Sequence, residues 1–250
     1  MLPRIVPVLT PEQKENLVVV LAGARNPLNI GAAARAMSNF GFCTLRIVTE
    51  FPLPVTEAKS AVDAAEVMQQ ATVHTSFAEA VADCGTIYGT TAVGNRKLEH
   101  PVEPLPQAAA HVRNALAGKQ RAAIVFGSEK TGMTNEQMSY CSGLLTIPME
   151  VHGTSMNLGQ SVAVCLWELA RDGVSASAIA AEDVPADSAA ADRFEAVLRE
   201  GLAATGYEAK FPANCGEEMT RRLVRRLRLN RKDVEIWTGI WRQVLWKLRK

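Results

Sequence analysis

The sequence predicts an α/β protein with a mostly parallel sheet, followed by a small C-terminal helical domain. Short β-branched runs alternate with helical patterns from residue 17 to residue 171, the order expected of a doubly wound parallel sheet. The first run, residues 17–21, is continuous and apolar, as in a strand buried on both faces. Beyond a stretch rich in Ala, Ser and Asp, only helical patterns follow.

Each element is placed by its own pattern. A break rich in Asn, Pro and Gly follows the first strand, so a helix is expected from about Gly31, with Asn29 as its cap. Further strands are expected at residues 44–48, 86–89, 122–126 and 143–147, and further helices at 58–70, 77–82, 107–116, 135–140 and 158–171.

The chain therefore divides into four parts. We expect a leader at 1–16, a sheet domain at 17–171, a linker at 172–192 and a basic helical domain at 193–250. Within the last part, helices are expected at 193–205, at 217–229 and from Asp233 onward. The last helix predicts a packing stripe at 3–4 spacing, made of Trp237, Ile240, Trp241, Val244, Leu245 and Leu248.

Charge is divided unevenly along the chain. Residues 193–250 hold 14 Lys and Arg against 7 Asp and Glu, whereas residues 1–192 hold 13 against 19. In the helix at 217–229, the expected apolar side consists of Met219, Leu223, Val224 and Leu227. The rest of that helix and the turn beyond it carry seven basic residues, Arg221, Arg222, Arg225, Arg226, Arg228, Arg231 and Lys232. We interpret this basic set as an RNA contact, with a merely solvated face as the alternative.

Bulk composition excludes several classes of protein. With 48% apolar and 21% charged residues among 250, the chain has material for a core. It has no run of the roughly 20 apolar residues that a helix needs to span a bilayer, and no signal-peptide pattern at its start. Its five cysteines are scattered without CxxC spacing, against both a disulfide framework and a zinc site. We therefore expect a cytoplasmic protein without a metal.

One arginine is surrounded by small residues. On a helix starting near Gly31, the residues three and four positions from Arg35 are Gly31, Ala32, Ser38 and Asn39. Such small neighbours let a substrate approach the guanidinium, which favours a functional arginine. An ordinary surface arginine is the alternative.

Two further segments combine strand, turn and polar residues. The loop GSEKTG at 127–132 lacks the phosphate-loop spacing, and GTTAVGNR at 89–96 lacks the dinucleotide fingerprint. Glu129 in the first loop is a candidate reactive group, or else an ordinary solvated carboxylate. Ser155 and Asn157 precede a predicted helix, so they either cap it or bind a ligand, and the two roles are compatible.

Three motifs in order carry a family resemblance. The segment NPLNIGAAARA at 26–36, IVFGSEKTG at 124–132 and IPMEVHGTSMNLG at 147–159 resemble the motifs of the SpoU/TrmH branch of the SPOUT methyltransferases. RFEAVLREGLAATGY at 193–207 and VEIWTGI at 234–240 resemble the C-terminal part of TrmJ-type tRNA 2′-O-methyltransferases. The resemblance implies a SPOUT fold with a C-terminal trefoil knot, a bound S-adenosylmethionine and a homodimer.

The resemblance also implies roles for single residues. The cofactor pocket would include Thr90, Thr91, Ala92, Gly127, Ile147, Ser155, Met156 and Asn157. The reaction-site residues would be Arg35, Glu129, Ser155 and Asn157, with Asn29 supporting the first turn. Because guanidinium stays protonated, we expect Arg35 to stabilise negative charge on the reacting oxygen. Either subunit of the dimer is a candidate source of this arginine. Proton removal would then fall to solvent, a substrate phosphate or Glu129.

The function implied is methylation of a ribose 2′-hydroxyl in RNA. A tRNA is the favoured substrate, at the pyrimidine that opens the anticodon loop (position 32). Ribosomal RNA is the nearest alternative, and a non-catalytic RNA-binding module on the same scaffold is an alternative from another class. A nicotinamide oxidoreductase is disfavoured because the glycine fingerprint is missing.

Overall fold

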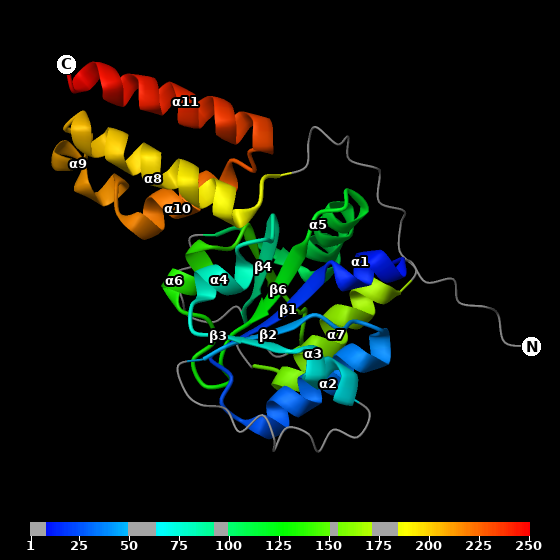
Figure 1. Ribbon diagram of the computed structural model, residues 1–250. Helices are drawn as coiled ribbons and strands as arrows, with labels where there is room; N and C mark the ends of the chain where they lie inside the picture. The colour runs from blue at the N-terminus through cyan, green and yellow to red at the C-terminus, as the bar shows by residue number, and fades with distance from the viewer. Residues whose placement is uncertain (1–8, 50–63, 93–99, 151–154, 172–184) are drawn as a thin grey trace, which may run out of the picture.

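In the part of the chain that the structure describes, seven parallel strands form the central sheet, in the order β3-β2-β1-β6-β4-β7-β5. The computed structural model describes residues 9–49, 64–92, 100–150, 155–171 and 185–250 (Figure 1). The strands are β1 (Leu17–Ala22), β2 (Leu45–Val48), β3 (Thr72–His74), β4 (Thr86–Thr90), β5 (Val102–Pro104), β6 (Ala122–Phe126) and β7 (Gly143–Thr146). The prediction of a mostly parallel α/β sheet is confirmed.

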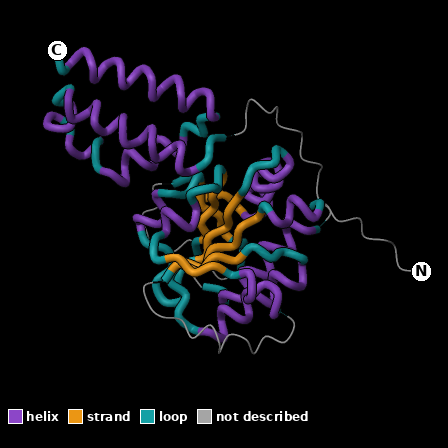
Figure 2. Tube along the Cα trace, viewed as in Figure 1, coloured by secondary structure: helices purple, strands orange, loops and turns teal. Residues whose placement is uncertain are grey.

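Helices cover both faces of this sheet (Figure 2). One face packs on α2 (Pro27–Phe40), α3 (Ala65–Gln70), α5 (Leu105–Ala117) and α7 (Leu158–Ala170). The other face packs on α4 (Phe77–Val81) and α6 (Asn135–Ser139). Side chains of β1 alternate between the two cores, with Val19 in the first and Val18 in the second. All six residues of β1 are buried, as its apolar run predicts.

Three short elements leave no clear signal in the sequence. The strands β3 and β5 have three residues each and lie at the two edges of the sheet. Such strands are too short for an alternating pattern to show. The helix α1 (Pro11–Glu15) lies in the predicted leader. Residues 58–63 of the helix expected at 58–70 lie outside the described residues, and α3 covers the remainder from Ala65.

The leader, to which the sequence assigned no role, contacts the sheet unit. Thr10 and Gln13 form a capping box that starts α1. The Nζ atom of Lys14 donates to the Phe40 carbonyl at 2.8 Å, and the Thr44 hydroxyl donates to the Glu15 carbonyl at 2.8 Å. These bonds hold α1 beside the end of α2 and the start of β2.

The connection between β6 and β7 passes over a neighbouring strand. Both β6 and β7 pair with β4, on opposite sides, so the chain crosses β4 between them. The trefoil knot itself stays a prediction. Within the described residues, no helix combines the length and apolar character needed to span a bilayer.

A separate helical unit lies beyond one end of the sheet (Figure 1). It contains α8 (Ser188–Ala204), α9 (Tyr207–Lys210), the 3-10 helix η3 (Pro212–Asn214), α10 (Glu217–Arg226) and α11 (Arg231–Leu248). The first helix begins inside the predicted linker, because Asp187 caps it by accepting from the backbone of Ala190 at 2.7 Å. The backbone N–H of Ser188 donates to the Cys84 carbonyl at 3.0 Å, so this unit packs beside the N-terminal end of β4.

The predicted division of α10 into a buried apolar side and an exposed basic side is wrong. Leu223 and Leu227 are 41% and 51% exposed, whereas Arg221, Arg222 and Arg225 are 6%, 8% and 7% exposed. Only Val224 of the predicted apolar side is buried. Arg221 and Arg225 point toward the sheet unit and α8, where their guanidinium groups meet hydrogen-bond acceptors.

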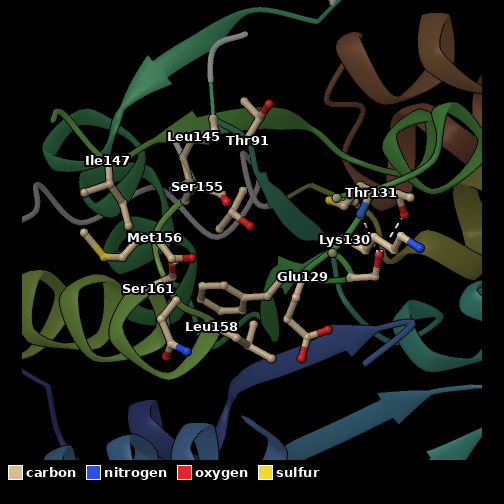
Figure 3. A pocket seen from close by; sticks show the side chains of 18 of the residues that line it. Thr91, Glu129, Lys130, Thr131, Leu145, Ile147, Ser155, Met156, Leu158 and Ser161 are labelled. Atoms are coloured by element: carbon tan, nitrogen blue, oxygen red, sulfur yellow. Dashed lines mark hydrogen bonds between the residues drawn. The ribbon is translucent and has the colours of Figure 1, made fainter. Parts of the chain in front are cut away.

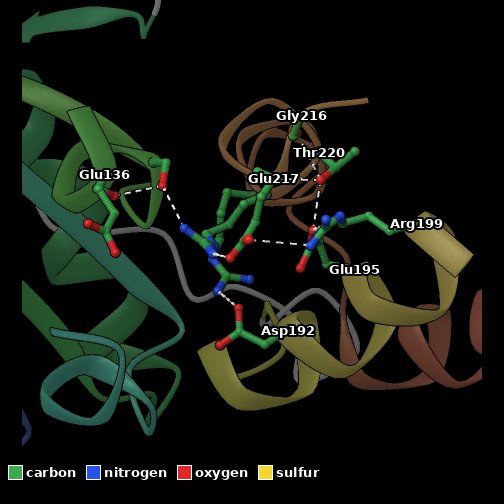
Figure 4. Close-up of polar contacts among 10 residues, drawn as sticks. Glu136, Asp192, Glu195, Arg199, Gly216, Glu217 and Thr220 are labelled. Carbon is green, nitrogen blue, oxygen red and sulfur yellow. Dashed lines mark hydrogen bonds and ion pairs between the residues drawn. The ribbon is translucent and has the colours of Figure 1, made fainter. Parts of the chain in front are cut away.

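The polar contacts of Arg221 and Arg225 explain why these two side chains are buried, and Figure 4 shows the acceptors Asp192 and Glu217. Arg225 Nη2 donates to Asp192 Oδ1 at 2.5 Å and to the Ser188 hydroxyl at 2.8 Å. Arg221 donates to the Ser139 hydroxyl of α6 at 3.1 Å and pairs with Glu217. Arg221 and Arg225 therefore each link α10 to another element through a charge-assisted hydrogen bond. RNA contact stays a prediction here only for the exposed Arg226 at the end of α10 and Arg228 just beyond it.

The predicted packing stripe of α11 is wrong for three of its six residues. Trp237, Ile240 and Leu248 are 44%, 47% and 50% exposed, while Leu245 is buried. The packed side of α11 contains Leu245 and Trp241 of the predicted stripe, the latter with its ring against Gly201 of α8, and also Val234, which the stripe did not include. A helix that packs on one neighbour buries a narrower stripe than a helix inside a larger core.

Candidate active site

A cavity of about 410 Å³ lies where β4, β6 and β7 end and α7 begins. Figure 3 shows side chains from these segments around it. The predicted residues on its wall are Asn29, Thr90, Thr91, Ala92, Gly127, Glu129, Ile147, Ser155, Met156 and Asn157. All eight predicted cofactor residues thus line one cavity at the carboxyl edge of the sheet, the usual ligand site of such folds. Cofactor binding by them stays a prediction.

Hydrogen bonds hold the strand ends that form this wall. The Thr90 hydroxyl donates to the Val125 carbonyl at 3.0 Å, which ties β4 to β6. The Thr91 N–H donates to the Leu145 carbonyl at 2.9 Å, which ties the residue after β4 to β7. The strands therefore hold Thr90 and Thr91 in fixed positions in the cavity wall.

The loop after β6 is a tight turn. The N–H of Gly132 donates to the Ser128 carbonyl at 2.8 Å, and the hydroxyls of Ser128 and Thr131 lie 2.7 Å apart. Gly132 has φ +68°, a conformation that favours glycine. A Cβ atom on Gly127 would collide with the backbone of Gly132 and Met133. Both glycines are thus required by the turn that carries Glu129.

Glu129 and Asn29 face each other across the site. The amide of Asn29 donates to Glu129 Oε1 at 2.6 Å, joining residues a hundred positions apart in sequence. The prediction that Asn29 caps α2 is wrong: Asn26 is the cap, and its Oδ1 accepts from Leu28 N at 3.0 Å. Asn29 lies inside the first turn, which frees its amide for Glu129.

Of the two roles that the sequence left open for Asn157, capping is confirmed and ligand binding stays a prediction. It caps α7, with Oδ1 accepting from the N–H of Gly159 at 3.0 Å and of Gln160 at 3.4 Å. It also lines the cavity, so its amide nitrogen remains for a ligand. Ser155 lines the same cavity and is exposed.

Arg35 is the predicted site residue that the structure does not bring to this cavity. It is exposed on the outer face of α2, and the cavity wall does not include it. Leu28 and Ala32 lie on the same face and are also exposed, Leu28 by 70%. Within one protomer, Arg35 and the cavity are therefore separate.

Sequence motifs also missed part of the wall. The additional residues are mainly apolar: Phe126, Met133, Met138, Leu145, Met149 and Leu158, with Ser128, Lys130, Thr131, Gly132 and Ser161. Several lie inside the quoted motifs, so proximity to a motif was an available signal. Met138 lies in α6, outside the quoted motifs, and carries no such signal. Among the described residues, no three His, Cys, Asp or Glu side chains come together as a metal site.

The predicted RNA-binding residues lie elsewhere. Arg231 and Lys232 begin α11 and are exposed, and they line a groove with Lys119 and Arg121, which precede β6. This groove is at the amino edge of the sheet, opposite the cavity. Arg221, Arg222 and Arg225 are buried, so in this arrangement they are not open to RNA.

Comparison with known families agrees with the fold and the motifs. The model of the SpoU rRNA Methylase family matches residues 16–167, which is more than half of the chain. The chain belongs to the SpoU methylase family.

Individual relatives extend this likeness. The chain is 30% identical over 237 residues to the tRNA (cytidine/uridine-2′-O-)-methyltransferase TrmJ of Yersinia enterocolitica, covering 90% of each protein. It is 36% identical over 155 residues to the tRNA (cytidine-2′-O-)-methyltransferase TrmJ of Methanocaldococcus jannaschii, covering 60% of this chain and 66% of that one. An uncharacterized tRNA/rRNA methyltransferase of Haemophilus influenzae is 36% identical over 157 residues, 63% of its length. The match spans just under two thirds of the last two proteins.

Solved structures show the same fold. TrmJ from Z. mobilis ZM4 superposes with a TM-score of 0.75 at 28% identity, covering 91% of this chain and 98% of that one. A probable methyltransferase from Bordetella pertussis Tohama I superposes with a TM-score of 0.60 at 29% identity, covering 64% and 97%. The first likeness extends over the sheet unit and the helical unit together.

Proposed function

We propose that this protein is an S-adenosylmethionine-dependent tRNA ribose 2′-O-methyltransferase. The observation that carries the proposal is the convergence of residues from all three sequence motifs on one cavity. The names of the relatives that match over 90% of both chains point to the same reaction.

The cavity fits the cofactor in size and in lining. A volume of about 410 Å³ lies within the range of small-molecule sites. Apolar side chains such as Leu145, Ile147 and Met156 would take the adenosine, while Thr91 and Ser155 supply polar groups at the rim. When bound, the cofactor would supply a methyl group activated by a sulfonium leaving group.

The protein's own share in the reaction is positioning and charge. A ribose hydroxyl is a weak nucleophile until it loses its proton, so a nearby acceptor is needed. Glu129 is a carboxylate at the cavity wall, and its hydrogen bond from Asn29 holds it in place. Arg35 would donate hydrogen bonds to the developing oxyanion and to the adjacent phosphate, because guanidinium binds such groups in a planar, bidentate manner. Solvent and a substrate phosphate remain alternative proton acceptors.

A homodimer would bring Arg35 to a cavity. Leu28 is 70% exposed on the side of α2 that carries Arg35 and Ala32, and Trp167 of α7, the helix that packs on α2, is 53% exposed. Exposed apolar side chains of this kind mark association surfaces. We propose that two copies pack through this face and that each Arg35 serves the partner's cavity.

Mixing two inactive variants tests this arrangement. Arg35→Ala leaves the cavity intact, and Thr91→Trp fills it. If Arg35 acts across the dimer, the mixed protein regains activity, because one protomer supplies the arginine and the other supplies the cavity. If Arg35 acts within its own protomer, the mixture stays inactive.

Mass mapping of ribose methylation tests the reaction itself. Purified protein, the cofactor and total RNA should yield a 2′-O-methyl group on tRNA, at the pyrimidine that opens the anticodon loop. Methylation confined to ribosomal RNA would favour the alternative substrate. Cofactor binding by calorimetry without transfer to any RNA would refute the proposed activity.

A further inference from the structure

A second cavity, of about 900 Å³, adjoins the candidate active site. It lies at the carboxyl ends of β1 and β2, and it shares Asn29 and residues 128–132 with the first cavity. The hydrogen bond between Asn29 and Glu129 therefore marks the boundary between the two. After β1 the chain continues into α2 on one face of the sheet, whereas after β6 it continues into α6 on the other face. Ligands of open α/β sheets bind at such a change of face.

An aromatic pair forms one wall of this second cavity. Phe77 begins α4 and is half-buried, and its ring centroid lies 5.4 Å from that of Tyr140 at an interplanar angle of 57°. Both rings line the cavity. The Arg221 guanidinium also contacts Tyr140, lying 4.2 Å from the centroid of its ring. Tyr140 is thereby fixed, and it fixes Phe77 in turn.

The remaining wall carries the chemistry that a nucleotide needs. Arg25 and Lys130 provide positive charge for a phosphate, and Thr49 and Thr75 provide hydroxyl groups. Proteins that bind an unpaired base stack it on an aromatic ring and hold its backbone with cations. The wall thus has a stacking surface, cations and hydrogen-bonding groups within one cavity.

We propose that the second cavity holds the base of the nucleotide that is methylated, with Phe77 as its stacking surface. This inference rests on the proposed function. A base against Phe77 places its ribose toward the Asn29–Glu129 boundary, from which the 2′-hydroxyl faces the first cavity. Phe77 is then a substrate-binding residue, and the cavity on the β1–β2 side selects the base.

Two substitutions at one position separate stacking from packing. Phe77→Leu keeps an apolar side chain against Tyr140 but removes the ring, whereas Phe77→Ala removes both. We expect KM for tRNA to rise on the order of 10-fold in Phe77→Leu, since stacking of one base on an aromatic ring contributes that much. The dissociation constant of the cofactor should stay within about 2-fold of wild type by the same reasoning, because Phe77 is absent from the first cavity.

A matched control comes from the strand beside it. Val73 of β3 is 51% exposed and lies outside both cavity walls, so Val73→Ala should leave KM for tRNA unchanged. Thermal unfolding of each variant verifies that it is folded. A folded Phe77→Leu protein with normal cofactor affinity and unchanged KM would overturn the proposal.

A second measurement does not depend on catalysis. tRNA transcribed with 4-thiouridine is irradiated in complex with the wild-type protein, and the cross-linked peptides are identified by mass spectrometry. Cross-links from the anticodon loop to residues 75–78 or 137–140 support the proposal. Cross-links confined to the helical unit or the amino edge of the sheet would contradict it. Failure of the proposed function appears instead as the absence of methyl transfer by wild-type protein.

Discussion

The sheet unit and the helical unit bury different kinds of residue. In the sheet unit, buried side chains are mainly apolar, and α7 buries its predicted residues Val162, Cys165 and Leu169. In the helical unit, α10 buries three arginines and exposes two leucines. The difference arises from the neighbours: α7 packs on an apolar sheet, whereas α10 packs on polar atoms of α6 and α8. Apolar periodicity therefore locates a core reliably only where the facing surface is itself apolar.

The largest expected effect comes from breaking a buried ion pair. Arg225→Met leaves Asp192 without its partner, so the free energy of unfolding should fall by about 3 kcal/mol. The Arg225 side chain is only 5% exposed, and it bonds to Asp192 and Ser188. Urea denaturation measures the change. Arg226→Gln, on the exposed side of the same helix, is the control and should change little. Equal effects of both substitutions would mean that α10 is not oriented in this way.

A pair of apolar substitutions sharpens the same comparison. Val224 is 2% exposed and belongs to the core of the helical unit, so Val224→Ala should cost about 2 kcal/mol. Leu227 is 51% exposed, so Leu227→Gln should change stability by less than about 0.5 kcal/mol. Chemical denaturation compares the two. A larger loss for Leu227→Gln than for Val224→Ala would restore the amphipathic orientation that the sequence predicts.

Two glycines distinguish packed from open positions on neighbouring helices. A Cβ on Gly201 of α8 would collide with the Trp241 ring, so Gly201→Ala should destabilise the unit by roughly 1–2 kcal/mol. A Cβ on Gly239 of α11 would meet no atom within 4 Å, so Gly239→Ala should stabilise the helix by up to about 1 kcal/mol. Opposite signs in thermal unfolding are expected. The same sign for both would place Trp241 away from α8.

The smallest expected effect lies in the sheet unit and depends on pH. Burial alone would raise the pKa of Asp83, but hydrogen bonds from Arg46 and Arg121 outweigh it and hold the pKa well below its usual range. The stabilisation is therefore complete above the unfolded pKa of about 3.9 and is lost as pH falls below it. Asp83→Asn should cost roughly 1 kcal/mol or less at pH 7, because Asp83 is 46% exposed. The difference in stability between the variant and wild type should shrink as pH falls below about 3.9, and it should vanish only below the folded-state pKa of Asp83. A constant difference across that range would exclude the ion pairs as its source.

Much of the sheet unit could be predicted from the sequence. The run from Leu17 is entirely buried, and residues from distant motifs meet at one cavity because parallel strands end at the same edge. The cap of α2 was misassigned between Asn26 and Asn29 because both precede the apolar helix residues. Only tertiary contact with Glu129 distinguishes their roles.

The helical unit was harder to predict, for a physical reason. Its arginines alternate with leucines in α10, and the sequence alone cannot reveal that Asp192 and Ser139 lie opposite those guanidinium groups. The second cavity was invisible for a similar reason. Phe77 and Tyr140 are far apart in the chain and belong to no motif, and they meet only when α4 and α6 pack on one face of the sheet.

The ring of Tyr140 connects two parts of the molecule that the chain keeps apart. It contacts both Phe77 of the sheet unit and Arg221 of the helical unit. A change in the packing of α10 on α6 would therefore tilt this ring and change the shape of the second cavity. A chain truncated before the last helices should consequently bind its nucleotide substrate more weakly, although it keeps every motif. The reason is that water would replace the Arg221 guanidinium beside Tyr140.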